Sequence, residues 1–249
     1  MRKLSFIFLL IAVCIPVFAE DFVPAYELGQ EGPGGGIVFF ISEQGFDVPD
    51  GKGNTMRCHY LEVAKEDLKV KKSNEIPFYP KNVDQYQLSK TTKASLGQGK
   101  QNTYLIVTNE ATLYGKKPKP MTAENCAAMA CYKFKTPTTE EGDWFLPSQD
   151  ELILLDIMIC YYIPELRSIL EDDMIIGQKQ FKKTVKHAKS YFSSTIYLSE
   201  RLTGSSIRWA CVYRRNISLL ADRIDTYIPN KLTEDGKFIS GYVRPMHAF

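Results

Sequence analysis

Strand-like segments lie at both ends of this chain and helix-like segments lie between them, and this order restricts the possible folds more than any other feature. Residues 36–41 (GIVFFI) form a short apolar run after a glycine cluster, and residues 59–63 form a second run with the composition of a β-strand. Between them, residues 45–54 (GFDVPDGKGN) have the proline, aspartate and glycine content of a hairpin loop. The chain is therefore predicted to open with a β-hairpin.

The middle of the sequence predicts helices. Residues 122–134 are rich in alanine and begin with a threonine that can act as a helix N-cap. Ser148 and Glu151 have the spacing of a capping box, in which each side chain bonds the backbone N–H of the other residue, and they open an apolar helix over residues 151–161. A further helix is predicted within residues 171–189.

The other strand-like runs lie beside and after these helices, at residues 143–147, 191–197, 207–213 and 238–246. Helices flanked by strands at both ends indicate an α+β fold rather than an alternating βαβ fold. Residues 20–249 are numerous enough to bury one good core. We therefore predict one domain over residues 20–249, with an irregular insertion at about residues 65–101.

Residues 1–19 have the three parts of a secretory signal peptide. A basic start is followed by an apolar run at residues 4–17 and by Ala19, the small residue before the cleavage site. A membrane-spanning helix needs about 20 apolar residues, and this run is shorter. An alternative is a lipoprotein cleaved before Cys14, which we favour less because a bulky valine precedes that cysteine. The mature protein is expected outside the cytoplasm, in the periplasm, on the outer surface or secreted.

Charge argues against a nucleic-acid partner. The whole chain carries 31 basic and 29 acidic residues. The leader contains two of the basic residues and none of the acidic ones, so the mature chain carries 29 of each. A neutral chain lacks the excess of positive charge typical of proteins that bind nucleic acids. The mature chain also has no second apolar stretch long enough to predict a transmembrane segment.

Five cysteines remain once the leader is removed: Cys58, Cys126, Cys131, Cys160 and Cys211. Because the number is odd, at least one of them is free or pairs between chains. Two interpretations stay open at this point, namely disulfides formed outside the cytoplasm and small buried hydrophobic residues. Cys126 and Cys131 form a lone Cys-x4-Cys pair without a second pair at metal-ligand spacing, so no zinc site is predicted.

A set of motifs extends over nearly the whole mature chain. They are LGQEGPGGGIVFFI at 28–41, HYLEVA at 59–64, LGQGKQNT at 96–103, GDWFLPSQDEL at 142–152, YFSST at 191–195, RWACVY at 208–213 and GYVRPMHAF at 241–249. In this order they resemble the Lcl C-terminal-domain family of bacteria. The resemblance implies a C-type-lectin-like fold, in which the chain ends pair in one small sheet, two helices pack nearby and a long irregular region presents the ligand surface. It implies no particular ligand.

The residues of these motifs have structural explanations. The glycines allow a tight turn into the first strand, the tryptophan and its neighbours fill the core, and the serine and glutamate satisfy helix N-terminal amides. The glycine cluster precedes a strand and lacks both G-x-G-x-x-G and a Walker lysine, so we expect no phosphate there. The motif residues to which we assign a structural role are Gly34, Gly35, Gly36, Trp144, Pro147, Ser148, Glu151, Trp209, Arg244 and Pro245.

Calcium-dependent lectin activity is disfavoured. The nearest candidate for the ligand triplet is Ile228-Pro229-Asn230, which has an apolar residue in place of the first ligand, and Trp209 is followed by an alanine and a cysteine. Calcium needs several oxygen ligands, and these positions do not supply them. No metal and no other cofactor is predicted.

The sequence also lacks the usual signatures of an enzyme. It contains no G-x-S-x-G elbow and no H-E-x-x-H, and its three histidines are scattered. A distant relative of the C-type-lectin-like fold uses reactive cysteines near its C-terminal strands, and Cys211 here lies beside Arg208, Arg214 and Arg215. The neighbouring residues do not match that enzyme, so a cysteine-dependent oxidoreductase is the weakest of the three hypotheses that we retain.

The most suggestive functional feature is the basic segment at residues 179–189 (KQFKKTVKHAK), which contains no acid. On a helix, Lys179, Lys182, Lys183 and Lys186 would share one face. The structural alternative is a solvated helix face. We predict an exported, non-catalytic recognition or adhesion module that binds a glycan, for example an anionic one, or a protein through these lysines and the three arginines. The alternative is a self-associating structural protein of the cell envelope, for which an oligomer is expected.

Overall fold

The structure of the protein is a computed structural model that describes residues 22–71, 73–78, 93–108, 121–163, 190–200, 206–214, 226–227 and 240–249. The helices are α1 (Gly99–Val107), α2 (Ala127–Lys133) and α3 (Gln149–Ile157), and a π-helix, η2 (Met158–Tyr162), continues α3. The strands are β1 (Ile37–Pro49), β2 (Thr55–Val63), β3 (Ile76–Pro77), β4 (Ser190–Glu200), β5 (Ser206–Arg214), β6 (Thr226–Tyr227), β7 (Ser240–Gly241) and β8 (Met246–Ala248).

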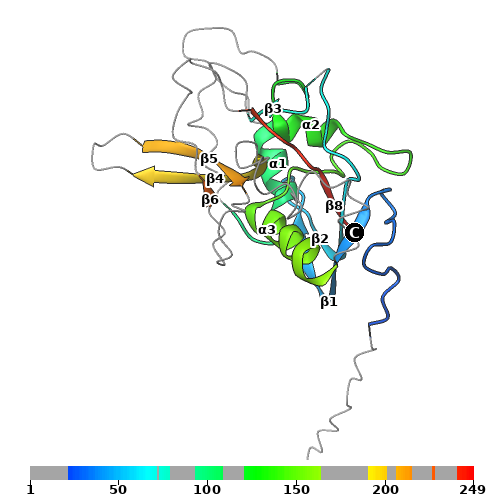
Figure 1. Cartoon of the computed structure of the whole chain (residues 1–249). Helices are drawn as coiled ribbons and strands as arrows, with labels where there is room; N and C mark the ends of the chain where they lie inside the picture. The colour runs from blue at the N-terminus through cyan, green and yellow to red at the C-terminus, as the bar shows by residue number, and fades with distance from the viewer. Residues whose placement is uncertain are drawn as a thin grey trace, which may run out of the picture.

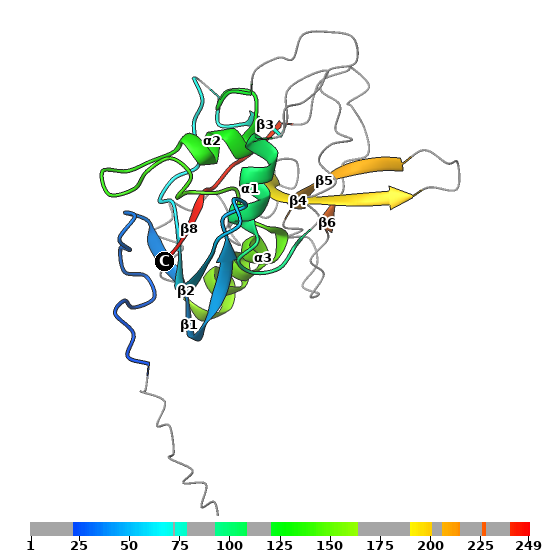
Figure 2. The ribbon, with the colours of Figure 1, turned by 180° about the vertical axis from the view of Figure 1, so that it is seen from behind.

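The strands form three small antiparallel sheets, with the orders β1-β2-β8, β3-β7 and β4-β5-β6. This architecture confirms the predicted α+β class. The first sheet joins the opening hairpin to the last strand of the chain. Figures 1 and 2 show that the N-terminal segment and the C-terminus lie side by side, whereas the ribbon of β4 and β5 extends from the opposite side of the body.

The predicted opening hairpin is confirmed, but its strands are longer than expected. β1 runs to Pro49 because a register irregularity between Ile41 and Phe46 takes up extra residues. Gly45 lies in this irregularity with φ of 70°, a conformation that favours glycine. The connecting loop is therefore only residues 50–54, where an aspartate side chain closes the turn by accepting backbone N–H bonds.

The helix predicted over residues 122–134 is shorter than expected, because α2 begins only at Ala127. The backbone N–H of Thr122 donates to the side-chain oxygen of Asn125 at 2.8 Å, and the N–H of Asn125 donates to the carbonyl of Thr122 at 3.1 Å. Asparagine closes this turn with its own side chain and thereby competes with the helix. Thr122 as an N-cap was therefore wrong.

Two further segments differ from the sequence-based expectation. Helix α1 begins at Gly99, within the segment predicted to be irregular. Residues 143–147 form no strand, because only Phe145 pairs, through two backbone bonds of 2.9 and 3.0 Å with Met246. The next N–H, that of Leu146, donates instead to the side chain of Thr103 at 2.9 Å.

The later strand predictions are confirmed in part. The runs at 191–197 and 207–213 lie within β4 and β5. Of residues 238–246, the structure describes 240 onwards and assigns strand only to the short β7 and to the start of β8. The helix predicted within 171–189 lies outside the described residues. No helix in the described part of the chain is long and apolar enough to cross a membrane.

Within the described residues, two hydrophobic clusters form the core, and the segment Trp144–Leu146 contributes to both. Phe145 belongs to the first cluster, with the β1-β2-β8 sheet and α3. Leu146 belongs to the second cluster, with residues of α1 and α2. Trp144, Phe145 and Leu146 are all 0% exposed, which confirms that this motif fills the core. Adjacent side chains of an extended segment point to opposite sides, which lets one short segment serve both clusters.

Candidate functional site

The residues predicted to bind a ligand fall into two groups. Lys179, Lys182, Lys183, Lys186 and Arg215 lie outside the described residues. Arg208 and Arg214 lie in β5, as does the motif residue Trp209. The β4-β5 register places Trp209 opposite Tyr197, Arg208 opposite Leu198, and Arg214 opposite Ser190. The structure therefore places the two described arginines on the same strand as an aromatic motif residue.

The ribbon of β4 and β5 has a buried base. Tyr191, Phe192 and Ser193–Thr195 at its base are buried in the body. Beyond this point, residues 196–200 of β4 pair with residues 206–210 of β5, and among the described residues β6 meets β5 only at Val212 and Tyr213. Figure 1 shows this outer part of the ribbon extending away from the helices. The ribbon is the first candidate site, because Trp, Tyr and Arg are enriched where proteins contact partners.

The glycine cluster surrounds a buried carboxylate of the protein itself. The backbone N–H groups of Gly34 and Gly36 each donate to Glu62, in both cases at 2.8 Å, and the Nδ1–H of His247 donates to the same carboxylate at 2.6 Å. Glu62 is 0% exposed. A Cβ atom at Gly34 would overlap this carboxylate, and one at Gly36 would lie 2.6 Å from the backbone oxygen of Val63. The glycines are therefore needed for close approach, as well as for a turn.

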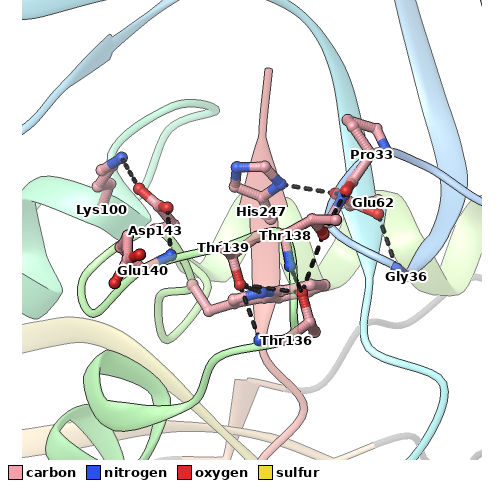
Figure 3. A network of polar contacts seen from close by, with 12 residues as sticks. Pro33, Gly36, Glu62, Lys100, Thr136, Thr138, Thr139, Glu140, Asp143 and His247 are labelled. Atoms are coloured by element: carbon pink, nitrogen blue, oxygen red, sulfur yellow. Dashed lines mark hydrogen bonds and ion pairs between the residues drawn. The ribbon is translucent and has the colours of Figure 1, made fainter.

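Figure 3 shows the polar contacts of this carboxylate together with those of the neighbouring segments. The indole N–H of Trp144 donates to the hydroxyl of Thr139 at 3.0 Å, and the hydroxyl of Thr138 donates to the carbonyl of Pro33 at 2.6 Å. The ring of His247 lies between Trp144 and Phe249, with ring centroids 5.5 and 5.8 Å away. Aromatic rings and hydroxyl groups thus connect the glycine loop to the segment before Trp144.

A carboxylate bonded to an imidazole can orient the base of an acid–base catalyst. In the described part of the chain, however, His247 bonds to no hydroxyl or thiol that it could activate. Its side chain is 12% exposed, and its partner Glu62 is fully buried. The pair joins β2, β8 and the glycine loop, so its geometry supports a structural role.

A buried ion pair accounts for the arginine of the arginine-proline ending. Arg244 donates from Nε to Asp67 at 2.6 Å, and from Nη1 to the carbonyls of Ala64 and Lys65 at 3.1 and 3.0 Å. The hydroxyl of Tyr191 donates to the other oxygen of Asp67 at 3.1 Å. The side chains of Arg244 and Asp67 are only 2% and 8% exposed. This pair therefore fixes the segment after β2 to the base of the ribbon.

The carboxylate of Glu151 accepts hydrogen bonds at the N-termini of two helices, α1 and α3. The predicted capping box is confirmed, since the side chain of Ser148 accepts from Glu151 N–H while Glu151 accepts from Ser148 N–H at 2.6 Å. The same carboxylate accepts from the N–H of Gly97 at 2.9 Å and from that of Gly99, at the start of α1. Helix α1 has no side-chain cap of its own. One buried carboxylate therefore satisfies N-terminal amides of both α1 and α3.

We expect Glu151 to make stability depend on pH. Burial raises the pKa of Glu151 from about 4.5 to about 7. A raised pKa means that the folded protein holds this proton more tightly, so the contribution is favourable at low pH and is lost as pH rises from about 4.5 to about 7. The free energy of unfolding, relative to Glu151→Gln, should fall by about 1–3 kcal/mol over this range. Urea unfolding of both proteins at several pH values measures the difference, and a constant difference would contradict it.

The described cysteines are buried free thiols. Cys58, Cys126 and Cys131 form no disulfide and are all 0% exposed. Burial raises the pKa of Cys58 and of Cys126 to about 11, and that of Cys131 well above its ordinary value. A thiol with a raised pKa is a poor nucleophile. Of the two interpretations of these cysteines, the buried hydrophobic residue applies to these three, and the side chains of Cys160 and Cys211 lie outside the described residues.

Other candidate sites in the described part of the chain are weak. No cluster of three or more His, Cys, Asp or Glu side chains there could hold a metal ion. An open hollow of about 400 Å³ is lined by Val70, Lys71, Ser73, Glu75 and Glu124. An ion pair of 2.5 Å between Lys71 and Glu124 joins two of its lining segments. The backbone of Lys71 is left-handed, with φ of 59°, and Lys71 follows Val70, which forms an antiparallel bridge with Ser73.

Several residues that organise the site have partners far along the chain, which no sequence pattern indicates. Glu62 and Asp67 bond to partners 185 and 177 positions away, and Asn102 reaches Ser194 across 92 positions. Glu62, Asn102 and Ser194 lie within the motifs HYLEVA, LGQGKQNT and YFSST, but these motifs do not indicate which residues they contact. Comparisons of the chain with protein-family models, with curated proteins and with solved structures gave no match.

Proposed function

We propose that the protein is a non-catalytic recognition module that acts outside the cytoplasm, and that the β4-β5 ribbon contacts its partner, an anionic glycan or a protein. The observation that carries the proposal is the register of the ribbon, which pairs Tyr197 with Trp209 and Leu198 with Arg208. Aromatic rings stack on sugars and on side chains, and arginine bonds carboxylate and sulfate groups in a bidentate manner.

The buried charges support a recognition role better than a catalytic one. Glu62, Glu151 and the Arg244–Asp67 pair are all bonded within the protein and connect segments of the body. The three described thiols have raised pKa values. We therefore propose that a partner contacts polar groups of the ribbon and, on sequence grounds, of the lysine segment at 179–189.

The proposed location and fold rest on the sequence. The leader at residues 1–19 favours export, and the motif series favours a C-type-lectin-like fold related to the Lcl C-terminal-domain family. Pairing of β8 with β2 agrees with the expectation that both chain ends share one small sheet. Export, fold family and ligand class together form one proposal.

The test uses the mature chain, residues 20–249, on arrays of neutral and sulfated glycans and on a panel of extracellular-matrix proteins, at low and at physiological salt. We expect binding that Trp209→Ala weakens by tenfold or more, which is about 1.4 kcal/mol or more, as for an interface hot spot. Arg208→Ala should weaken binding less, and mainly at low salt. Arg57→Ala, which removes one charge from the distant β1-β2 hairpin, is the matched control.

Absence of binding on every surface at both salt concentrations would overturn the proposal. Light scattering of the same sample separates it from the alternative function. A defined oligomer that forms without any ligand would favour the self-associating envelope protein, whereas a monomer that binds would favour the recognition module.

A further inference from the structure

The pairing of β4 with β5 is interrupted where β4 leaves the body. Its register with β5 is irregular between Phe192 and Ile196, and the irregularity contains Ser193–Thr195. All three are polar and all three are 0% exposed. Buried polar groups need hydrogen-bond partners, so an interruption made of hydroxyl side chains suggests a specific connection to the body.

Hydrogen bonds from this interruption reach two segments of the body. The N–H and the hydroxyl of Ser194 both donate to the carbonyl of Pro147, at 2.7 and 3.1 Å. The hydroxyl of Thr195 accepts from the N–H of Gln149 at 3.0 Å and donates to the carbonyl of Lys93 at 3.2 Å. The interruption therefore bonds to the start of α3 and to the segment before α1.

Asn102 of α1 completes this connection. Its Nδ2 group donates to the carbonyl of Lys93 at 2.7 Å and to the hydroxyl of Ser194 at 3.4 Å. Asn102 is 0% exposed, and its Oδ1 atom accepts no bond from the described residues. Rotating the amide would place this oxygen against the carbonyl of Lys93, so the position requires a donor. We refer to Asn102, Ser194 and Thr195 as the polar latch.

We propose that the polar latch is the positioning element that holds the β4-β5 ribbon at a fixed orientation on the body, with Asn102 as its central donor. The ribbon beyond Thr195 pairs, among described residues, within its own small sheet. The latch lies where the ribbon meets the body, so its bonds decide whether the ribbon moves with the body or separately. Only the role of the ribbon in recognition rests on the proposed function.

The test is hydrogen–deuterium exchange of the mature chain, measured by mass spectrometry. Asn102→Asp replaces the donor by an acceptor of nearly the same shape, facing the carbonyl of Lys93. We expect exchange in the outer ribbon, residues 196–200 and 206–210, to rise about tenfold, while β1, β2 and β8 change less than about twofold. Asn74→Asp makes the same chemical change at an exposed turn and should leave the ribbon unaffected.

Unchanged exchange in the ribbon, or an equal rise throughout the protein, would overturn the proposal. If Asn102→Asp does not fold, Ser194→Ala tests the latch instead, because it removes one hydroxyl and keeps the backbone hydrogen bond to Pro147. It should raise ribbon exchange about threefold or more, and no local rise would reject the latch. Exchange needs no ligand, so a wild-type protein that binds nothing overturns the proposed function alone.

Discussion

Replacement of Arg244 by methionine is expected to lower the free energy of unfolding by about 3–5 kcal/mol, because it leaves a buried carboxylate without its cation. Arg244 supplies one ion pair and two backbone hydrogen bonds, and both it and Asp67 are shielded from water. Methionine fills a similar volume, so the loss reports the missing charge and hydrogen bonds rather than a cavity. Urea unfolding followed by circular dichroism measures the change.

The matched control is Arg57→Met. Arg57 also forms an ion pair, with Asp47 at 2.8 Å, but the two side chains are 54% and 67% exposed. Exposed pairs contribute about 0–1 kcal/mol, so this variant should differ little from the wild type. In the double variant Asp67→Asn/Arg244→Met, part of the lost stability should return, because the unpaired charge is gone. Equal losses for Arg244→Met and Arg57→Met would refute the argument from burial.

Replacement of Glu62 by glutamine is expected to cost about 2–4 kcal/mol, although the side chain keeps its shape. Both carboxylate oxygens of Glu62 accept hydrogen bonds, from Gly34, Gly36 and His247. Glutamine has one acceptor oxygen and one donor group, so its NH₂ group must face an N–H group at a position that is fully buried. Thermal and urea unfolding of the variant measure the loss.

Glu43→Gln is the control for this second prediction, because Glu43 lies exposed on β1. Surface changes of this kind usually stay within about 0.5 kcal/mol. A loss below about 1 kcal/mol for Glu62→Gln would show that the glycine loop tolerates an amide.

Features with a local cause were predictable from the sequence. The capping box of Ser148 and Glu151 needs residues only three positions apart, and the structure contains it. The opening hairpin follows from two apolar runs and a loop rich in turn residues. The wrong N-cap prediction at Thr122 has a local cause too, since Asn125 can close a turn with its own side chain.

Features with partners far along the chain were not predictable. Helix α1 has no N-cap side chain of its own. The acceptor at its N-terminus is Glu151, which lies 54 positions from Gly97 in the sequence. The turn at the glycine cluster is predictable from its composition, whereas no sequence pattern indicates that a carboxylate of β2 occupies it. The ribbon could be predicted as two strands, whereas its connection through Asn102 depends on a contact across 92 positions.

The pairing of β8 with β2 affects how the chain folds while it is being synthesised. Leu61 pairs with Ala248, so β2 obtains its second neighbour in the first sheet from a strand far along the chain. A chain that emerges residue by residue from a ribosome therefore carries an open edge on β2 until β8 has emerged. Contacts between such distant residues slow folding, so we expect this sheet to be completed late. Removal of residues 246–249 should leave an intermediate with that edge exposed.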